Sequence, residues 1–407
     1  MRDDVLTRPG FKPGALDGVP AALQPFVDTG ALSGVVTLTY RDGEVAQVNT
    51  LGLADMEAGT PMRRDTLFRI ASMSKPVTSV AAMMLVEEGK VSLDDPVHRF
   101  IPSWKGMGVY QSGMPGLWAT TPTAAPMRTI DLLRHTSGLT YGFQNRTNVD
   151  AAYRRAKVND FATEGGLAKM MEDMASIPLE FSPGTAWNYS VSVDVLGYLV
   201  EKISGQSFDA FLKERIFDPL GMSDTSFHVP EDKLDRLAAC YALAPGGGMA
   251  LQDPAGPGST FAKAPALLSG GGGLLSTAHD YMRFCRMLLN GGTLDGQRIL
   301  SRKTLHLMTL NHLPDGKELT DVSTSMFSEA VFNGLGFGLG FAVTVDVART
   351  QNIGSLGEYF WGGMASTAFW VDPVEDLTVV FLTQLMPSHA YPIRRELRTL
   401  VYAALDD

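Results

Sequence analysis

The sequence has few cysteines, little excess positive charge and no long apolar run. Its 407 residues contain two cysteines, Cys240 and Cys285, so a disulfide framework is not expected and a reducing compartment suits the chain. The formal net charge of −10 disfavours nucleic acid and anionic membranes as partners, because both are bound by clustered lysine and arginine. No stretch of about 20 apolar residues occurs, and the N-terminal MRDDVLTRPG lacks the apolar core of an export signal. We therefore expect a cytoplasmic protein with no membrane partner.

Several common catalytic motifs are also missing. No G-x-S-x-G elbow of a Ser-His-Asp hydrolase is present, nor is the H-E-x-x-H spacing of a zinc enzyme. The alternating glycines of 334–340 have neither dinucleotide-loop spacing nor a Walker lysine. We expect no metal and no cofactor, and we interpret His135 as the anchor of a helix end rather than as a triad member.

The chain is too long for one compact core, since single cores stop growing at about 250–300 residues. The β-prone runs 34–40 and 44–55 flank Arg41-Asp42-Gly43 and predict a β-hairpin. Residues 129–220 are mostly helical in pattern, with 203–217 as the clearest helix. The other expected strands cover 336–346, 366–372 and 377–383, and the other expected helices cover 21–31, 72–88, 276–290 and 393–405.

Strands near both ends of the chain and helices between them predict an α/β (α+β) protein. We expect residues 1–95 and 265–407 to form one α/β region and residues 96–264 to form an inserted, mainly helical region. The active site is expected in the cleft between the two. The segment 106–127, rich in glycine, proline, alanine and threonine, is expected to be an extended loop. Its Tyr110, Leu117 and Trp118 are candidates for setting acyl-chain preference.

The candidate nucleophile lies in Ser72-Met73-Ser74-Lys75, at the start of the helix expected over 72–88. Residues i and i+3 share one face of a helix, so the Lys75 amine can reach the Ser72 hydroxyl. A serine hydroxyl is a poor nucleophile until a base takes its proton, and a lysine whose pKa is lowered by burial can be that base. The spacing alone is weak, because an N-cap serine followed by a surface lysine gives the same pattern.

Five further segments strengthen this interpretation by their order along the chain. They are DLLRHTSGL (131–139), PGTAWNYS (183–190), FDPLGMSDT (217–225), SGGGGLLSTAHDYMRF (269–284) and FGLGF (336–340). With Ser72-x-x-Lys75 they make residues from about 30 to 400 resemble the superfamily of serine β-lactamases and penicillin-binding proteins. The resemblance implies a β-lactamase/transpeptidase-like fold, with an antiparallel sheet flanked by helices beside the inserted helical region.

The resemblance also implies roles for residues far from Ser72 in sequence. Tyr189 stands where the family carries Tyr-x-Asn, and it would act as base for Ser72, as proton donor to the leaving group and as activator of water. A nearby lysine ammonium would favour phenolate character in Tyr189. The backbone N–H groups of Ser72 and Met364 would form the oxyanion hole.

The third family motif, usually Lys-Thr-Gly or His-x-Gly, is represented here by Trp361-Gly362-Gly363. The glycines would let a substrate approach the backbone closely. Trp361 cannot attract a substrate carboxylate as the family lysine does, and Val191 cannot hydrogen-bond an amide as the family asparagine does. These substrate-binding positions therefore favour neutral, apolar acyl groups, a combination similar to the family VIII carboxylesterases.

The sequence thus predicts a serine carboxylesterase that hydrolyses small, neutral, short-chain esters through an acyl-enzyme on Ser72. Three alternatives stay open. A β-lactamase or DD-peptidase is disfavoured by the two lost polar anchors and the missing export signal. An acyltransferase on the same scaffold would pass the acyl group to an alcohol. A ligand sensor would be acylated once and stay acylated. The sequence does not indicate an oligomeric state.

Overall fold

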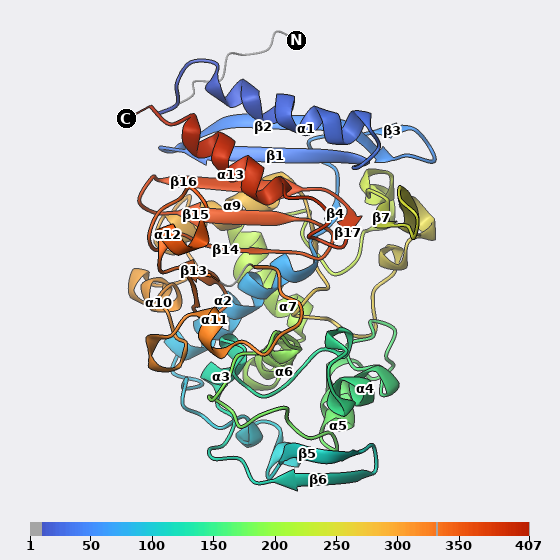
Figure 1. Cartoon of the computed structure of the whole chain (residues 1–407), viewed down its shortest axis with the longest axis vertical. Coiled ribbons are helices and arrows are strands. Elements are labelled where there is room, and N and C mark those ends of the chain that lie inside the picture. The colour runs from blue at the N-terminus through green and yellow to red at the C-terminus, as the bar shows by residue number, and fades with distance from the viewer. Residues whose placement is uncertain (1–9, 331–332, 407) are drawn as a thin grey trace.

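The computed structural model describes residues 10–330 and 333–406. Figure 1 shows an elongated molecule in which the first and last described segments lie beside a sheet at the top, helices fill the middle, and a small hairpin forms the opposite end. The arrangement places a sheet made from both ends of the chain next to a helical section made from its middle.

The main sheet is antiparallel, with the strand order β12-β13-β14-β15-β16-β1-β2-β3. Its strands are β1 (Gly34–Arg41), β2 (Glu44–Asp55), β3 (Thr60–Pro61), β12 (Leu335–Phe337), β13 (Ala342–Thr344), β14 (Tyr359–Gly362), β15 (Ala368–Asp372) and β16 (Leu377–Leu382). β1 pairs with β16 in a register that runs from Val36 opposite Leu382 to Arg41 opposite Leu377. The N-terminal hairpin and the C-terminal strands therefore join in the middle of the sheet, which confirms the predicted α/β class with an antiparallel sheet.

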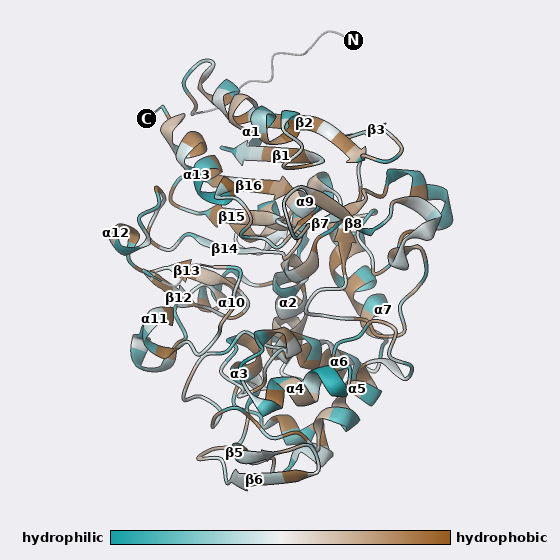
Figure 2. Cartoon of the chain, turned by 45° about the vertical axis from the view of Figure 1, so that its right-hand side comes forward, coloured by the Kyte–Doolittle hydropathy of each residue, from teal (hydrophilic) through white to brown (hydrophobic). Residues whose placement is uncertain are grey.

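Helices cover both faces of this sheet. α1 (Gly18–Asp28) and α13 (Ile393–Ala403) pack on one face, and α9 (Ala278–Leu289) packs on β1, β15 and β16 from the other. All eight residues of β1 are buried, as expected for a strand with both faces covered. Figure 2 shows the corresponding hydrophobic colouring of β15 and β16 between the helices.

The helical section surrounds α2 (Ser74–Glu87), which is buried from Ser74 to Leu85 and packs against α6. Its helices are α3 (Thr129–Leu133), α4 (Asn148–Arg155), α5 (Gly166–Met174), α6 (Ser192–Ser204), α7 (Phe208–Leu212) and α8 (Asp218–Leu220). The prediction of one helix over 203–217 was wrong. α6 ends at Ser204 because Gly205 adopts a left-handed conformation (φ 75°), and a π-helical turn over Lys213–Phe217 follows α7.

Two further expectations need correction. Residues 106–127 contain a hairpin, β5 (Val109–Met114) and β6 (Leu117–Thr121), rather than an extended loop. Its turn is Pro115-Gly116, where Gly116 has φ 89°. The predicted strand 336–346 is split into β12 and β13 by a turn at Gly340, whose φ is 102°.

A smaller sheet joins the middle of the chain to its end. β7 (Cys240–Leu243) pairs with β8 (Met249–Asp253) and, in parallel, with β17 (Leu385–Met386). Residues 240–253 therefore contact the end of the chain, although the sequence assigns them to the inserted region.

The remaining strands and helices are short. They are β4 (Phe68–Arg69), β9 (Leu275–Ser276), β10 (Thr293–Leu294), β11 (Gln297–Arg298), α10 (Arg302–Met308), α11 (Leu319–Val322) and α12 (Val347–Thr350).

The two cysteines do not bond to each other, since Cys240 and Cys285 are buried free thiols. Among the helices of the described residues, none has the length and apolar character needed to cross a membrane.

Candidate active site

Ser72 lies at a sharp transition between a short strand and a long helix. β4 ends at Arg69, Ala71 takes a left-handed conformation (φ 47°), and a 3-10 turn over Ala71–Met73 leads into α2. A left-handed non-glycine residue costs about 1–2 kcal/mol, and such strain is concentrated at functional sites. The Ser74 hydroxyl stabilises the turn, since it donates to the Ala71 carbonyl at 2.7 Å and accepts from the Leu274 N–H at 3.1 Å.

The Lys75 amine lies beside the Ser72 hydroxyl, as the i, i+3 spacing predicts. Its Nζ donates to Ser72 Oγ at 3.1 Å and to the Gly271 carbonyl at 2.6 Å. Burial lowers the pKa of Lys75 to about 7, although the negative charges of Asp194 and Glu329 act in the opposite direction. A large fraction of Lys75 is therefore the free amine at neutral pH, which is the form that accepts a proton.

Tyr189 approaches the same hydroxyl from the other side. Its O–H donates to Ser72 Oγ at 2.6 Å, and the Lys75 Nζ lies 4.6 Å from the centre of its ring. Burial raises the pKa of Tyr189 well above its usual value of about 10. The expectation of phenolate character was therefore wrong, because the loss of solvation, together with the negative charges of Glu329 and Asp194, disfavours the phenolate.

His135 does not belong to this group. Its Nδ1 lies 3.2 Å from Ser190 Oγ, and its ring packs edge-on against Tyr189 and Trp187. Burial lowers the pKa of His135 well below its usual value, so the ring stays neutral. This agrees with a structural role for the histidine, at the end of α3 and under Tyr189.

The predicted third motif ends β14 and contacts the segment before Ser72. The Thr367 hydroxyl donates to the Ile70 carbonyl at 3.1 Å, and Gly363 N–H donates to the Thr367 carbonyl at 2.9 Å. A Cβ on Gly363 would lie 2.5 Å from the Ile70 oxygen, and one on Gly362 would lie 2.5 Å from the Arg394 guanidinium. Close packing against the Ile70 backbone therefore requires a glycine at position 363, whatever ligand approaches it.

Ser72 opens into a cavity of about 320 Å³. Its lining consists of Ala71, Ser72, Tyr141, Phe143, Asn159, Phe161, Tyr189, Gly271, Gly272, Phe327, Glu329, Met364 and Pro387. Met364, predicted for the oxyanion hole, therefore lines the same cavity as Ser72. Five of the lining residues lie between residues 141 and 189, in the helical section. The others lie before it in the sequence, at 71–72, and after it, between 271 and 387.

Four predicted substrate-binding residues do not line this cavity. Val191 is buried at the start of α6, and its N–H donates to the Thr140 carbonyl. Trp361 is 2% exposed and packs 5.4 Å from the Tyr189 ring. Gly362 and Gly363 are not among the lining residues, although the next residue, Met364, is one of them. Trp361 thus supports the position of Tyr189, and the sequence-based expectation of direct contact with a substrate finds no support in the cavity lining.

Two buried carboxylates near Lys75 were missed by sequence analysis. Asp194, in the first turn of α6, accepts the Gly271 N–H at 3.1 Å and the Ser269 hydroxyl, and so positions the loop whose carbonyl binds Lys75. Its place inside the otherwise apolar run 193–200 is a signal that could have revealed a buried acid. Glu329 lines the cavity itself, and no local pattern in the sequence distinguishes it.

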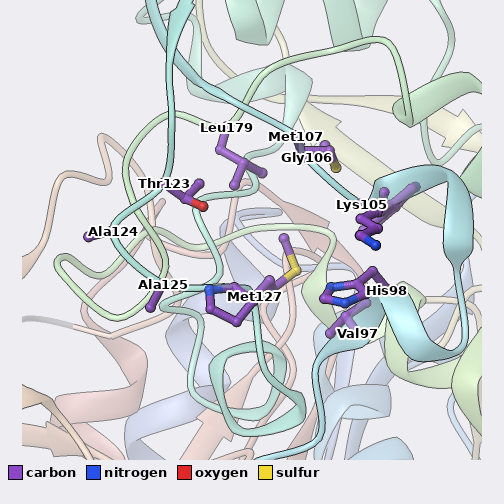
Figure 3. Close-up of a pocket in the computed structure, with 12 residues that line it drawn as sticks. Val97, His98, Lys105, Gly106, Met107, Thr123, Ala124, Ala125, Met127 and Leu179 are labelled. Carbon is purple, nitrogen blue, oxygen red and sulfur yellow. The ribbon is translucent and has the colours of Figure 1, made fainter.

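Among the described residues, the linings of the other cavities do not combine a serine, a lysine and a tyrosine. Figure 3 shows a hollow near β5 and β6, where His98 and Lys105 lie beside each other and the other side chains are mostly apolar. A further cavity lies behind Trp361 and is lined by residues of α12 and α13. Within residues 10–330 and 333–406, no three or more histidine, cysteine or acidic side chains are grouped as a metal site.

Comparison with known proteins identifies the family of the chain. The family model "Beta-lactamase" matches residues 19–404. Protein Rv1367c of Mycobacterium tuberculosis is 39% identical over 91% of this chain and 90% of its own length. Esterase EstB of Burkholderia gladioli is 32% identical over 91% of both. The solved structure of EstCE1, described as a hydrolase with promiscuous acyltransferase activity, has a TM-score of 0.79 and 27% identity, and the match covers 95% of this chain and 97% of EstCE1. The chain belongs to the beta-lactamase family.

Proposed function

We propose that this protein is a serine carboxylesterase that hydrolyses small, neutral, short-chain acyl esters through Ser72. The observation that carries the proposal is the position of Ser72 Oγ, which lies 3.1 Å from the Lys75 amine and 2.6 Å from the Tyr189 hydroxyl at the edge of a cavity. A nucleophile within hydrogen-bonding distance of a base that is neutral near pH 7 is the arrangement that acyl transfer requires.

Acylation begins when the free amine of Lys75 removes the Ser72 proton and Ser72 Oγ attacks the ester carbonyl. The negative charge that forms on the carbonyl oxygen is stabilised, in this proposal, by the backbone N–H groups of Ser72 and Met364. Tyr189 is a neutral phenol, so its O–H passes a proton to the departing alkoxide and is restored from the Lys75 ammonium. The alcohol leaves, and the acyl group stays on Ser72.

Deacylation uses the same groups in reverse. Lys75, again a free amine, accepts a proton from water directly or through Tyr189, and the hydroxide formed attacks the acyl carbonyl. The tetrahedral species breaks down when Ser72 Oγ leaves and regains its proton. The carboxylic acid is released, and the proton count of the enzyme is unchanged over the cycle.

The choice of an ester substrate has two supports. Esterase EstB and EstCE1, both similar to this chain over nearly its whole length, carry esterase or hydrolase in their descriptions. Trp361 stands where the family lysine would attract a substrate carboxylate, so acidic β-lactams and peptides lack that anchor. Assignment to the family VIII carboxylesterases is part of this proposal.

Acyl transfer to an alcohol is the second candidate activity. The description of EstCE1 names a promiscuous acyltransferase activity, and the proposed acyl-enzyme is the same in both reactions. The two differ in whether water or an alcohol enters the cavity after the first product has left.

The test is multiple-turnover hydrolysis of p-nitrophenyl butyrate by the wild type, by Ser72→Ala and by the exposed control Ser223→Ala. We expect turnover by the wild type and the control, and a loss of at least about a hundredfold in Ser72→Ala, because removing the nucleophile removes most of the acceleration. A single burst without turnover would favour a sensor. Equal rates for the wild type and Ser72→Ala would overturn the proposal.

A further inference from the structure

Trp361 carries a buried indole N–H that has no acceptor. The side chain is 2% exposed and is held between two rings, those of Tyr189 at 5.4 Å and of Phe337 at 5.4 Å, which it meets edge-on at 89°. Its Nε1 has no hydrogen-bond partner among the described residues. A buried donor without an acceptor destabilises the folded protein. Such a donor, fixed beside a group that moves protons, points to an acceptor that forms only during the reaction.

The group on which this N–H acts is the Tyr189 oxygen. Burial and the charge of Glu329 raise the pKa of Tyr189, whereas hydrogen bonding from the Ser72 and Trp361 side chains lowers it. A donor lowers the pKa of a phenol because it favours the phenolate over the neutral form. In the resting enzyme the phenol donates its own proton to Ser72 Oγ at 2.6 Å, and the Trp361 N–H forms no aligned bond to it. The indole therefore interacts more strongly with a phenolate than with the resting phenol.

Negative charge develops on the Tyr189 oxygen at one step of the proposed mechanism. The O–H bond of Tyr189 breaks as its proton passes to the departing alkoxide, and the Lys75 ammonium then restores that proton. Ser72 has no proton to donate at this stage, because its proton has moved to Lys75 and its Oγ is bonded to the acyl carbon. The charge of Glu329 disfavours the phenolate as well. The step is therefore helped by a fixed donor that keeps its own proton.

We propose that the indole N–H of Trp361 stabilises the negative charge that develops on the Tyr189 oxygen while Tyr189 protonates the leaving group. The interaction is stronger in the transition state than in the resting enzyme, so it accelerates this step instead of tightening substrate binding. One proton moves from Tyr189 to the leaving-group oxygen, and the indole keeps its own. This inference rests on the proposed esterase function and assigns Trp361 a part in one step of it.

The test removes the N–H and keeps the ring. 3-Benzothienylalanine has the shape of tryptophan, with a sulfur atom in place of the N–H, and it replaces Trp361 in the test variant. The matched control is the same replacement at Trp370, which is 1% exposed and whose Nε1 also has no partner among the described residues. Trp370 packs in the core beside α1 and α13, whereas Trp361 and Tyr189 share a separate core cluster.

Two butyrate esters separate protonation of the leaving group from the rest of acylation. p-Nitrophenolate is weakly basic and departs without a proton, whereas ethoxide is strongly basic and departs readily only when it is protonated. We measure kcat/KM for p-nitrophenyl butyrate and ethyl butyrate with the wild type and both variants. In the Trp361 variant, the ratio of ethyl to p-nitrophenyl butyrate should fall by about tenfold. The same ratio should be unchanged in the Trp370 variant.

An unchanged ratio in the Trp361 variant, or an equal fall in the Trp370 variant, would overturn the inference while leaving esterase activity established. So would a wild type that turns over p-nitrophenyl butyrate but not ethyl butyrate, because Tyr189 would then deliver no proton to an alkoxide. Failure of the wild type on both esters would overturn the proposed function and this inference together. If the Trp361 isostere does not fold, Trp361→Phe also lacks the N–H and is judged by the same ratio.

Discussion

Replacement of Asp194 by asparagine should move the pH profile of the enzyme without removing its activity. The proposed mechanism needs the free amine of Lys75, so kcat/KM should rise as the pH increases through the Lys75 pKa of about 7. Asp194 and Lys75 bond to the same residue, Gly271, through its N–H at 3.1 Å and its carbonyl at 2.6 Å. The negative charge of Asp194 favours the ammonium form of Lys75, and its removal lowers the pKa of the amine.

The size of the effect follows from Coulomb's law. For an assumed separation of about 7 Å, two unit charges interact by about 2.4 kcal/mol at an effective dielectric constant of about 20. At about 1.4 kcal/mol per pH unit this corresponds to about 1.7 pH units. Burial raises the pKa of Asp194 and thereby reduces its average charge, so we expect the rising limb to move by about one pH unit toward lower pH.

The assay is kcat/KM for p-nitrophenyl butyrate from pH 5 to pH 9 for the wild type, Asp194→Asn and the exposed control Asp209→Asn. Asparagine keeps an oxygen that accepts the Gly271 N–H, so the loop should stay in place. An unmoved limb in Asp194→Asn, or one that moves to higher pH, would refute the assignment of Lys75 as the base whose charge Asp194 controls. An equal movement in Asp209→Asn would attribute the shift to net charge alone.

Two further substitutions test separate parts of the account. Tyr189→Phe keeps the ring packing but loses the O–H bonded to Ser72 Oγ at 2.6 Å, so kcat/KM should fall by about 10²–10⁴ with an unchanged melting temperature; a loss below about threefold would contradict a proton-transfer role. Gly363→Ala would place a Cβ 2.5 Å from the Ile70 oxygen, and should lower the free energy of unfolding by about 1–3 kcal/mol in a urea titration; unchanged stability would contradict the close approach of β14 to the Ser72 segment.

Those parts of the site that depend on local geometry could be predicted from the sequence. Ser72 and Lys75 meet because residues i and i+3 share a helix face. Tyr189, 117 residues further along, could be associated with Ser72 only through the resemblance of the whole chain to a known superfamily. The contacts of Trp361 and Val191 could not be predicted, because a motif gives the position of a residue along the chain and does not show which way its side chain points.

Glu329 and Asp194 illustrate a second limit. Glu329 is an ordinary acid in the sequence, and the apolar neighbours of Asp194 indicate burial but not its partner. The importance of both comes from burial near Lys75, which arises only when distant elements pack together. The phenolate expectation for Tyr189 failed for the same reason, since the loss of water around the ring was not visible in the sequence.

Two predicted elements were wrong although the sequence contains signals for the observed structure. Pro115-Gly116 between β-prone runs indicates a hairpin, but the composition of 106–127 obscured it. Gly205 lay within the predicted helix 203–217 and in fact ends α6. In both cases a single glycine position decided the local structure.

The central claim is that Ser72 carries the acyl group during turnover. The most direct test is to mix the wild type with p-nitrophenyl acetate, quench with acid within the first turnovers, and locate the acetyl group by peptide mass spectrometry. The account predicts acetyl on the peptide that contains Ser72, at Ser72 itself, and none at that position in Ser72→Ala. Acetyl on Ser74 alone, or continued turnover by Ser72→Ala at the wild-type rate, would contradict it.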